Sequence, residues 1–151
     1  MTRRSQAREV ALLLLFQLDL NPEVSREDVV AFARTHLAEQ EEAIAFALAL
    51  YDGAVAARAA IDERLAKAAE NWRISRMATI DRNILRLGAH ELTASPDLPV
   101  GVVFNEAIEL ARRYGSADSP AFVNGVLDRL HRERGEPAAV AVPPSPEPSV
   151  P

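Results

Sequence analysis

Cysteine is absent from this chain of 151 residues, and lysine occurs once, as Lys67. The lack of cysteine excludes a disulfide scaffold, a thiolate metal site and a cysteine nucleophile. No uninterrupted apolar run approaches the roughly eighteen residues that a membrane-spanning helix needs. The N-terminus also lacks an apolar stretch followed by a small-residue cleavage site. We therefore expect a cytoplasmic protein with no membrane segment.

Recognisable catalytic motifs are missing as well. His36, His90 and His131 lie in different segments without the spacing of a metal site, and there is no glycine-rich phosphate loop or GxSxG sequence. Glu106 and Glu109 stand early in a predicted helix, where the helix dipole explains carboxylates without acid–base chemistry. The sequence predicts neither an enzyme nor a cofactor or metal site.

Composition divides the chain into a folded body and a tail. Hydrophobic residues make up 48% and charged residues 26%, which is typical of a globular protein. Residues 136–151 hold six of the ten prolines and no lysine, arginine or aromatic residue. Such a segment cannot build a core. We expect one folded region over residues 1–135 and a disordered tail over 136–151.

Arginine accounts for sixteen of the seventeen basic residues, although the net charge is −5. The total charge argues against a nucleic-acid ligand. However, Arg3, Arg4 and Arg8 all stand before the first acidic residue, Glu9. Arginine presents forked donors that suit phosphate oxygens and bases. A GC-rich genome would also explain the high arginine content, so the local cluster is more informative than the total.

The hydrophobic period is helical throughout, and no stretch alternates strictly between polar and apolar residues, so we predict an all-α fold. Ser5 and Ser25 are predicted N-caps, and Gly115 is predicted to end a helix in the left-handed conformation. Ser119 is predicted to cap the last helix, with Pro120 at its first position. A break is expected around residues 71–76. The predicted helices cover approximately residues 5–19, 25–37, 40–69, 77–93, 100–114 and 120–134.

The last predicted helix has a clear core face and one aromatic residue outside it. Val123, Val126, Leu127 and Leu130 share a face at 100° per residue, whereas Phe122 lies nearer Gly125 and Arg129. An aromatic ring beside a glycine and an arginine is suited to stacking on a nucleic-acid base. Packing on the rim of a neighbouring helix is the other interpretation, and the spacing leaves both open.

Two other helices carry charged residues whose role is ambiguous. In the first, Ala7, Ala11, Leu14, Leu15 and Leu18 share one face, and Arg8, Leu12 and Phe16 form an adjoining stripe. A helix that is apolar so far round is buried on two sides or packs against a partner subunit. In another helix, Asp81 lies beside Arg82, and Arg86 lies one turn further on. These residues could form an intrahelical ion pair, or the two arginines could together bind phosphates.

Four segments resemble the NusB family of bacterial transcription antitermination factors. They are RSQAREVALLLLFQ at 4–17, DRNILRLGAHEL at 81–92, PVGVVFNEAIELARRYG at 99–115 and SPAFVNGVL at 119–127. Their order and spacing extend over most of residues 4–130. The NEAIELA and FVNGVLD blocks are the specific part of the match.

The resemblance implies two packed helical subdomains, three helices followed by about four. It implies binding to the boxA element of ribosomal RNA leader transcripts together with NusE, a ribosomal small-subunit protein. The complex would join RNA polymerase and other Nus factors during elongation. The family pattern maps RNA contacts to Arg3, Arg4, Arg8, Phe16, Asp81, Tyr114 and Phe122, and the NusE contact to Asp118. To these the helical spacing adds Arg82, Arg86 and Arg129.

Two other classes of function stay open at this point. Ribosomal RNA cytosine methyltransferases carry an N-terminal domain that looks like NusB, but a methyl-donor domain needs a Rossmann-like sheet that this chain lacks. The acidic composition and apolar first helix also suit a helical homo-oligomeric scaffold that binds no RNA. The sequence does not distinguish a monomer from a homodimer.

Overall fold

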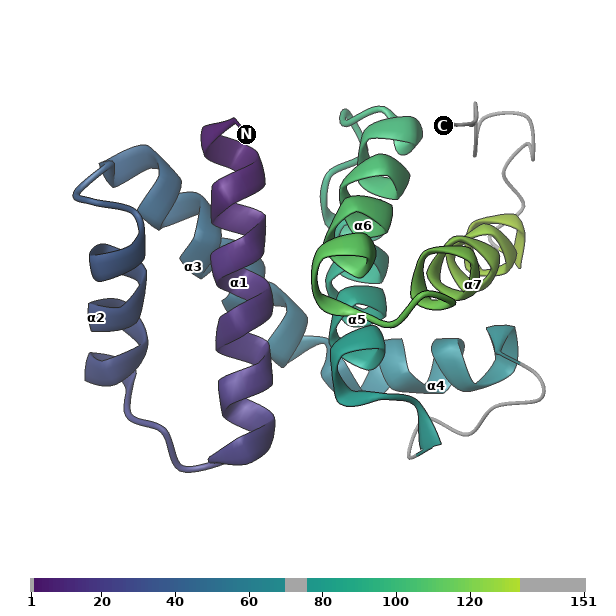
Figure 1. Cartoon of the computed structure of the whole chain (residues 1–151), viewed down its shortest axis with the longest axis horizontal. Coiled ribbons are helices and arrows are strands. Elements are labelled where there is room, and N and C mark those ends of the chain that lie inside the picture. Colours follow the sequence, from purple (N-terminus) through teal and green to yellow (C-terminus); the bar gives the residue numbers. More distant parts are fainter. Residues whose placement is uncertain (1, 70–75, 134–151) are drawn as a thin grey trace. The chain divides into compact units, whose positions relative to one another are not determined.

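The computed structural model describes residues 2–69 and 76–133, and in those ranges it contains seven α-helices and no β-strand (Figure 1). The predicted all-α class is therefore confirmed. The predicted tail over 136–151 and most of the predicted break over 71–76 lie outside the described residues. The helices are α1 (Arg3–Leu20), α2 (Arg26–His36), α3 (Glu41–Ala56), α4 (Arg58–Ala68), α5 (Thr79–Ala94), α6 (Val100–Tyr114) and α7 (Ser119–Glu133).

The helices fall into two compact units. The first unit ends at Arg58 and contains α1–α3, and the second begins at Ala59 and contains most of α4 and all of α5–α7. This division agrees with the three-plus-four arrangement that the resemblance implies.

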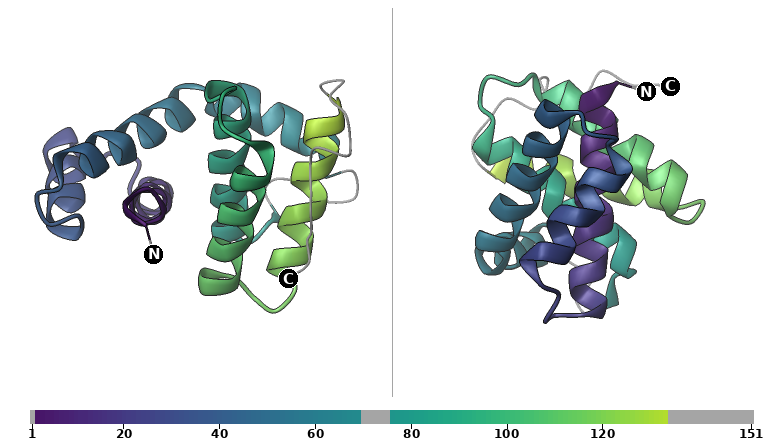
Figure 2. Two further views of the ribbon diagram at one scale, coloured as in Figure 1. Left: turned by 90° about the horizontal axis from the view of Figure 1, so that it is seen from above. Right: turned by 90° about the vertical axis from the view of Figure 1, so that its left-hand side faces the viewer.

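The first unit is built on the contact between α1 and α3. Helix α1, seen end-on in the left view of Figure 2, lies against α3, and α2 contacts both. Alanine allows these helices to approach closely, since Ala7, Ala11 and Ala47 are fully buried. The neighbouring stripe of α1 is buried too at Arg8 and Leu12, so α1 is covered on two sides, as one of the two interpretations of its sequence required.

Of the two N-terminal caps predicted in this unit, the one at Ser25 is confirmed and the one at Ser5 is wrong. Ser25 caps α2 as predicted, because its hydroxyl oxygen accepts the backbone N–H of Asp28 at 3.0 Å. Helix α1 begins earlier than predicted. Thr2 caps it and accepts the backbone N–H of Ser5 at 3.0 Å, so Ser5 lies inside the first turn.

The single long helix predicted over residues 40–69 is wrong. The helix stops at Ala57, which separates α3 from α4. Helical hydrogen bonding continues to that point, since the N–H of Ala57 donates to the carbonyl of Gly53 at 3.0 Å. No proline or capping side chain marks the stop. The break falls where the first compact unit ends.

The second unit is held together by the mutual contacts of α5, α6 and α7. The predicted core face of α7 is confirmed, because Val123, Leu127 and Leu130 are fully buried and Val126 is nearly so. Helices α5 and α7 approach closely at Gly88, where a Cβ would lie 3.2 Å from both Leu127 methyl carbons. Glycine at this position therefore sets how closely the two helices pack.

Helix α6 has the predicted bounds but not the predicted ending. Gly115 has φ −94° and ψ −168°, which is extended and not left-handed. Glycine is needed there because a Cβ would lie 2.4 Å from the Ser119 hydroxyl oxygen and 2.8 Å from the Ala111 carbonyl oxygen. Crowding by the next helix, and not the backbone torsion, selects glycine.

In the described ranges, no single helix has both the length and the apolar character to cross a membrane. Helices α3 and α4 meet those criteria only when the bent pair is taken together.

Candidate nucleic-acid interface

The start of α1 brings two of the predicted arginines onto one aromatic ring. The Cζ atoms of Arg4 and Arg8 lie 4.5 Å and 5.3 Å from the ring centroid of Phe46 in α3. We call these three residues the arginine–phenylalanine cluster. Arg3 and Arg4 are exposed, whereas Arg8 is only 3% exposed. Of the cluster, Arg4 is the arginine that solvent and a ligand can reach.

The chemistry of this cluster differs from that of an ion pair. A guanidinium over an aromatic face is attracted by the ring quadrupole, and the ring carries no net charge to neutralise it. In the described residues, Phe46 is the one partner in polar or cation–π contact with Arg4. The positive charge of Arg4 therefore stays available to a phosphate.

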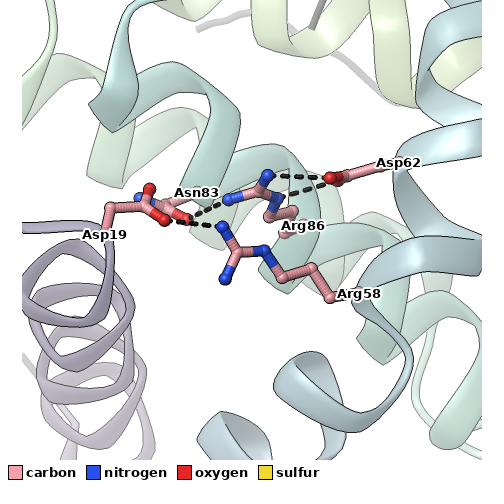
Figure 3. Close-up of polar contacts among 5 residues, drawn as sticks. All are labelled: Asp19, Arg58, Asp62, Asn83 and Arg86. Carbon is pink, nitrogen blue, oxygen red and sulfur yellow. Dashed lines mark hydrogen bonds and ion pairs between the residues drawn. The ribbon is translucent and has the colours of Figure 1, made fainter. Parts of the chain in front are cut away.

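Elsewhere in this unit, arginines form ion pairs with carboxylates, and Arg26 and Arg58 are two examples. Arg26 donates two hydrogen bonds to Asp52, at 2.6 and 3.0 Å, and this contact raises the pKa of Arg26. Arg58 donates to Asp19 near the end of α1 at 2.9 Å (Figure 3). These two arginines are neutralised by protein groups, unlike Arg4.

The three predicted aromatic contacts are all partly exposed. Phe16 lies on α1, Tyr114 is the last residue of α6, and Phe122 lies in the first half of α7. Phe122 is partly exposed beside the fully buried Val123, so it stands at the rim of the core face, as the helical wheel predicts. This position is compatible with base stacking and with packing on a neighbouring helix.

One face of α7 continues from Phe122 through Gly125 to Arg129. Gly125 and Arg129 are exposed, and a Cβ at Gly125 would meet no atom within 4 Å. The guanidinium of Arg129 also donates to the carbonyl of Ala68 at 3.1 Å, which satisfies a carbonyl at the end of α4. This face is therefore open in front of the glycine and positively charged at one end.

Arg86 has a structural partner on another helix. Its Nε and Nη2 donate to the two carboxylate oxygens of Asp62 in α4, both at 2.8 Å, and its Nη1 donates to Asn83 at 3.1 Å (Figure 3). The residue is 4% exposed. The ion pair with Asp81, one of the two interpretations of the spacing, is wrong for Arg86. The forked pair with Asp62 leaves this guanidinium poorly placed to bind a phosphate.

Two further predicted residues, Asp81 and Arg82, lie near the start of α5 and are partly exposed. Asp81 is in the first turn, where the helix dipole favours a carboxylate.

Asp118 is exposed in the turn between α6 and α7, and its carbonyl accepts the N–H of Phe122 at 3.1 Å. The next residue, Ser119, does not cap α7 in the predicted way. Its hydroxyl oxygen accepts the N–H of Ser116 at 2.9 Å and so bonds back toward α6. This bond and the crowding at Gly115 fix the turn that presents Asp118.

The predicted residues divide between the two units. Arg3, Arg4, Arg8 and Phe16 belong to the first, and Asp81, Arg82, Arg86, Tyr114, Asp118, Phe122 and Arg129 belong to the second. Among the described residues, no cluster of three or more histidine, aspartate or glutamate side chains is suited to a metal ion. The arrangement offers cationic and aromatic surface for binding.

Sequence reasoning missed Phe46 and Asp62. Phe46 lies in an alanine- and leucine-rich segment, where an aromatic residue is typical of a core. In the structure, Ala45 and Ala49 on the same helix are exposed, but the sequence does not reveal this exposure. Asp62 carries no local signal, because its arginine partner stands 24 residues later.

A family model and individual relatives both indicate the same family for this chain. The NusB family model matches residues 5–132. The chain is 45% identical to the transcription antitermination protein NusB of Sorangium cellulosum over 135 residues, which cover 89% of this chain and 96% of that protein. It is 44% identical to the protein of the same name from Anaeromyxobacter dehalogenans, covering 85% of this chain and 90% of the relative.

Solved structures are similar as well. T. maritima NusB has 32% sequence identity and a TM-score of 0.78, with 88% of this chain and 92% of that chain covered. A crystal structure of the antitermination factors NusB and NusE with double-stranded RNA has 31% identity and a TM-score of 0.79, covering 88% and 98% of the two chains.

Proposed function

This chain belongs to the NusB family, and we propose that it acts as a transcription antitermination factor that binds boxA RNA together with NusE. The observation that carries this proposal is the similarity, over almost the whole described chain, to proteins named for antitermination. A similar solved chain is bound to NusE and double-stranded RNA, which supports the same two partners here. In this role the protein would help RNA polymerase and other Nus factors to transcribe ribosomal RNA operons.

The proposed RNA contacts are the exposed and partly exposed residues of both units. From the first unit we propose Arg3 and Arg4 for phosphates and Phe16 for a base. From the second we propose contacts by Asp81, Arg82, Tyr114, Phe122 and Arg129, and assign Asp118 to NusE. Arg8 and Arg86 are nearly buried, so we assign them to support of the fold and not to direct contact.

The protein is proposed to act by binding alone. The chain contains none of the nucleophile–base pairs or phosphate loops that would suggest catalysis. The methyltransferase alternative is less well supported, because the relatives named NusB are matched over 90–96% of their own length. Methyl transfer to ribosomal RNA by the purified chain would contradict the binding-only role.

A gel-shift experiment tests the proposed function directly. The purified chain is titrated against a boxA RNA and against a scrambled RNA of the same composition, with and without NusE, at one stated salt concentration. We expect a shift with the boxA RNA that NusE strengthens. Equal binding to the two RNAs in the presence of NusE would contradict the proposal.

A further inference from the structure

Resting on the proposed function, we propose that Phe46 is a positioning residue for RNA binding, which holds the Arg4 guanidinium ready for a phosphate. Phe46 lies in α3 and is not one of the residues that the sequence pattern associates with RNA. The proposal starts from its contact with two arginines of the neighbouring helix α1.

The position of Arg4 over the Phe46 ring, with Cζ 4.5 Å from the ring centroid, explains how the ring can help. The cation–π attraction acts between the positive charge and the ring face and does not use the N–H donors as hydrogen-bond donors to a charged group. The ring restricts the side chain and leaves N–H donors for a phosphate. A phosphate can then accept hydrogen bonds from Arg4 while Phe46 remains in contact.

The surroundings of the ring make this restriction effective. Phe46 is partly exposed and belongs to the pair of helices with the most extensive contact in the first unit. An exposed arginine loses much rotamer freedom when it binds a ligand, and this loss opposes binding. Because the ring already limits the motion of Arg4, part of that loss occurs on folding and not on binding.

Arg8 adds a second positive charge to the same ring. Its burial keeps it from direct contact, but its Cζ lies 5.3 Å from the Phe46 centroid. Two guanidinium groups therefore gather at one neutral ring, and Arg4 is the one exposed to a phosphate. A carboxylate in place of the ring would hold Arg4 equally well but would cancel its charge.

The test compares variants that keep or remove the aromatic face. Phe46→Leu and Phe46→Met keep an apolar side chain without a π-system, and Phe46→Tyr is the matched control that retains the ring. We expect the two aliphatic variants to weaken binding to the boxA RNA by about two- to fivefold, because more of the rotamer freedom of Arg4 is then lost on binding. We expect Phe46→Tyr to bind like the parent.

Two further readouts separate positioning from simple structural damage. The salt slope of binding should be unchanged in Phe46→Leu, because the number of phosphate contacts is the same, and should become shallower in Arg4→Ala. In a double-mutant cycle, Phe46→Leu should have little further effect once Arg4 is removed. In the free protein, NMR should show a ring-current shift of the Arg4 side chain that Phe46→Tyr keeps and Phe46→Leu loses.

The outcomes distinguish this proposal from the proposed function. If the parent binds boxA RNA, but Phe46→Leu and Phe46→Met bind equally well, or the Phe46 and Arg4 effects simply add, the positioning role is overturned and the RNA function stands. If the parent shows no preference for boxA RNA, the proposed function fails and the positioning role fails with it. Weaker binding by the aliphatic variants at an unchanged melting temperature, with coupling to Arg4, supports the proposal.

Discussion

Arg86 is buried and makes a forked pair with Asp62, so its removal leaves an unpaired carboxylate in a partly buried place. We predict that Arg86→Met lowers the free energy of unfolding by about 3 kcal/mol, the lower end of the range for breaking a buried pair from one side. Urea denaturation of the parent and the variant measures this change.

The matched control is Arg112→Met. Arg112 pairs with Glu109 at 3.4 Å on the surface of α6, with both side chains more than half exposed. Such pairs contribute at most about 0.5 kcal/mol, so this variant should unfold almost like the parent. Equal stability losses in the two variants would show that the buried Arg86–Asp62 pair contributes no more to stability than the exposed Arg112–Glu109 pair.

His90 gives the protein a pH-dependent stability. Burial lowers the pKa of His90 in the folded protein, and the nearby Glu91 only partly opposes this effect. The unfolded chain therefore takes up this proton more readily once the pH falls below about 6.5. The stability contribution is fully present above that pH and is lost as the pH falls through the lowered pKa.

We predict that the parent loses stability between about pH 7.5 and pH 5.5 and that His90→Gln loses less over the same interval. Glutamine is polar but does not titrate in this range. Melting temperatures at the two pH values measure the difference. Parallel losses in the parent and the variant would assign the pH dependence to other groups.

Phe122 is the residue where stacking and packing predict different outcomes. It is partly exposed at the rim of the α7 core face. We predict that Phe122→Ala weakens RNA binding by about 1–3 kcal/mol, as for one base–aromatic contact, and melts near the parent temperature. Affinity is measured by gel shift, and stability by thermal melting.

Val123→Ala provides the comparison for damage to the core. Val123 is fully buried one position along the helix, and its truncation should cost about 1.5–3 kcal/mol of stability without a direct RNA effect. A loss of about 3–5 kcal/mol of stability in Phe122→Ala, with unchanged affinity, would instead place Phe122 in the packed core.

At the scale of helices, two glycines of the second unit should respond in opposite ways to the same substitution. Gly88→Ala places a Cβ 3.2 Å from two methyl carbons of the fully buried Leu127. The overpacking cost of about 1–3 kcal/mol exceeds the gain of about 1 kcal/mol in helix propensity. We therefore predict net destabilisation of Gly88→Ala.

Gly125→Ala introduces a Cβ on the exposed side of α7, where no atom lies within 4 Å. Only the gain in helix propensity remains, so we predict that this variant is up to about 1 kcal/mol more stable than the parent. Chemical denaturation of both variants decides the matter. If the free energy of unfolding changed in the same direction in Gly88→Ala and Gly125→Ala, contact with Leu127 would not control the distance between α5 and α7.

Most helices were predictable because their ends carry local signals. The bounds of α6 follow from Pro99 and Gly115, and those of α2 from Ser25. The division of the segment from residue 40 to 69 was not predictable, since neither a cap nor a proline precedes Ala57. The break coincides with the boundary between the two compact units, and that boundary depends on contacts between residues far apart in the sequence.

For the whole molecule, the net charge of −5 opposes the approach of RNA, so local contacts must supply the affinity. We predict that binding to single-stranded boxA RNA weakens with salt, with a log–log slope of about −0.7 for each phosphate contacted. Arg3→Ala and Arg4→Ala should each make the slope shallower by about that amount. Filter binding over a series of salt concentrations measures the slopes, and a flat dependence in the parent would contradict phosphate contacts.

The exposure of the proposed site residues was more predictable than their tertiary partners. The family pattern selected Arg4, Phe16 and Phe122, all of which have exposed or partly exposed side chains. Spacing along one helix also selected Arg86, but its partner lies on α4, which no local pattern reveals. Phe46 was missed for the same reason, since its role depends on contact with a different helix.

The break at Ala57 also has a consequence for the order of events during synthesis. Because the first compact unit consists of consecutive residues up to Arg58, all of its helices are translated before α5. Translation adds about 5–20 residues per second, so the rest of the chain takes several seconds. Helical units with local contacts fold in about microseconds to milliseconds. The amino-terminal unit can thus complete its core co-translationally, with Arg4 already against Phe46 before the last helices, α6 and α7, have been completed.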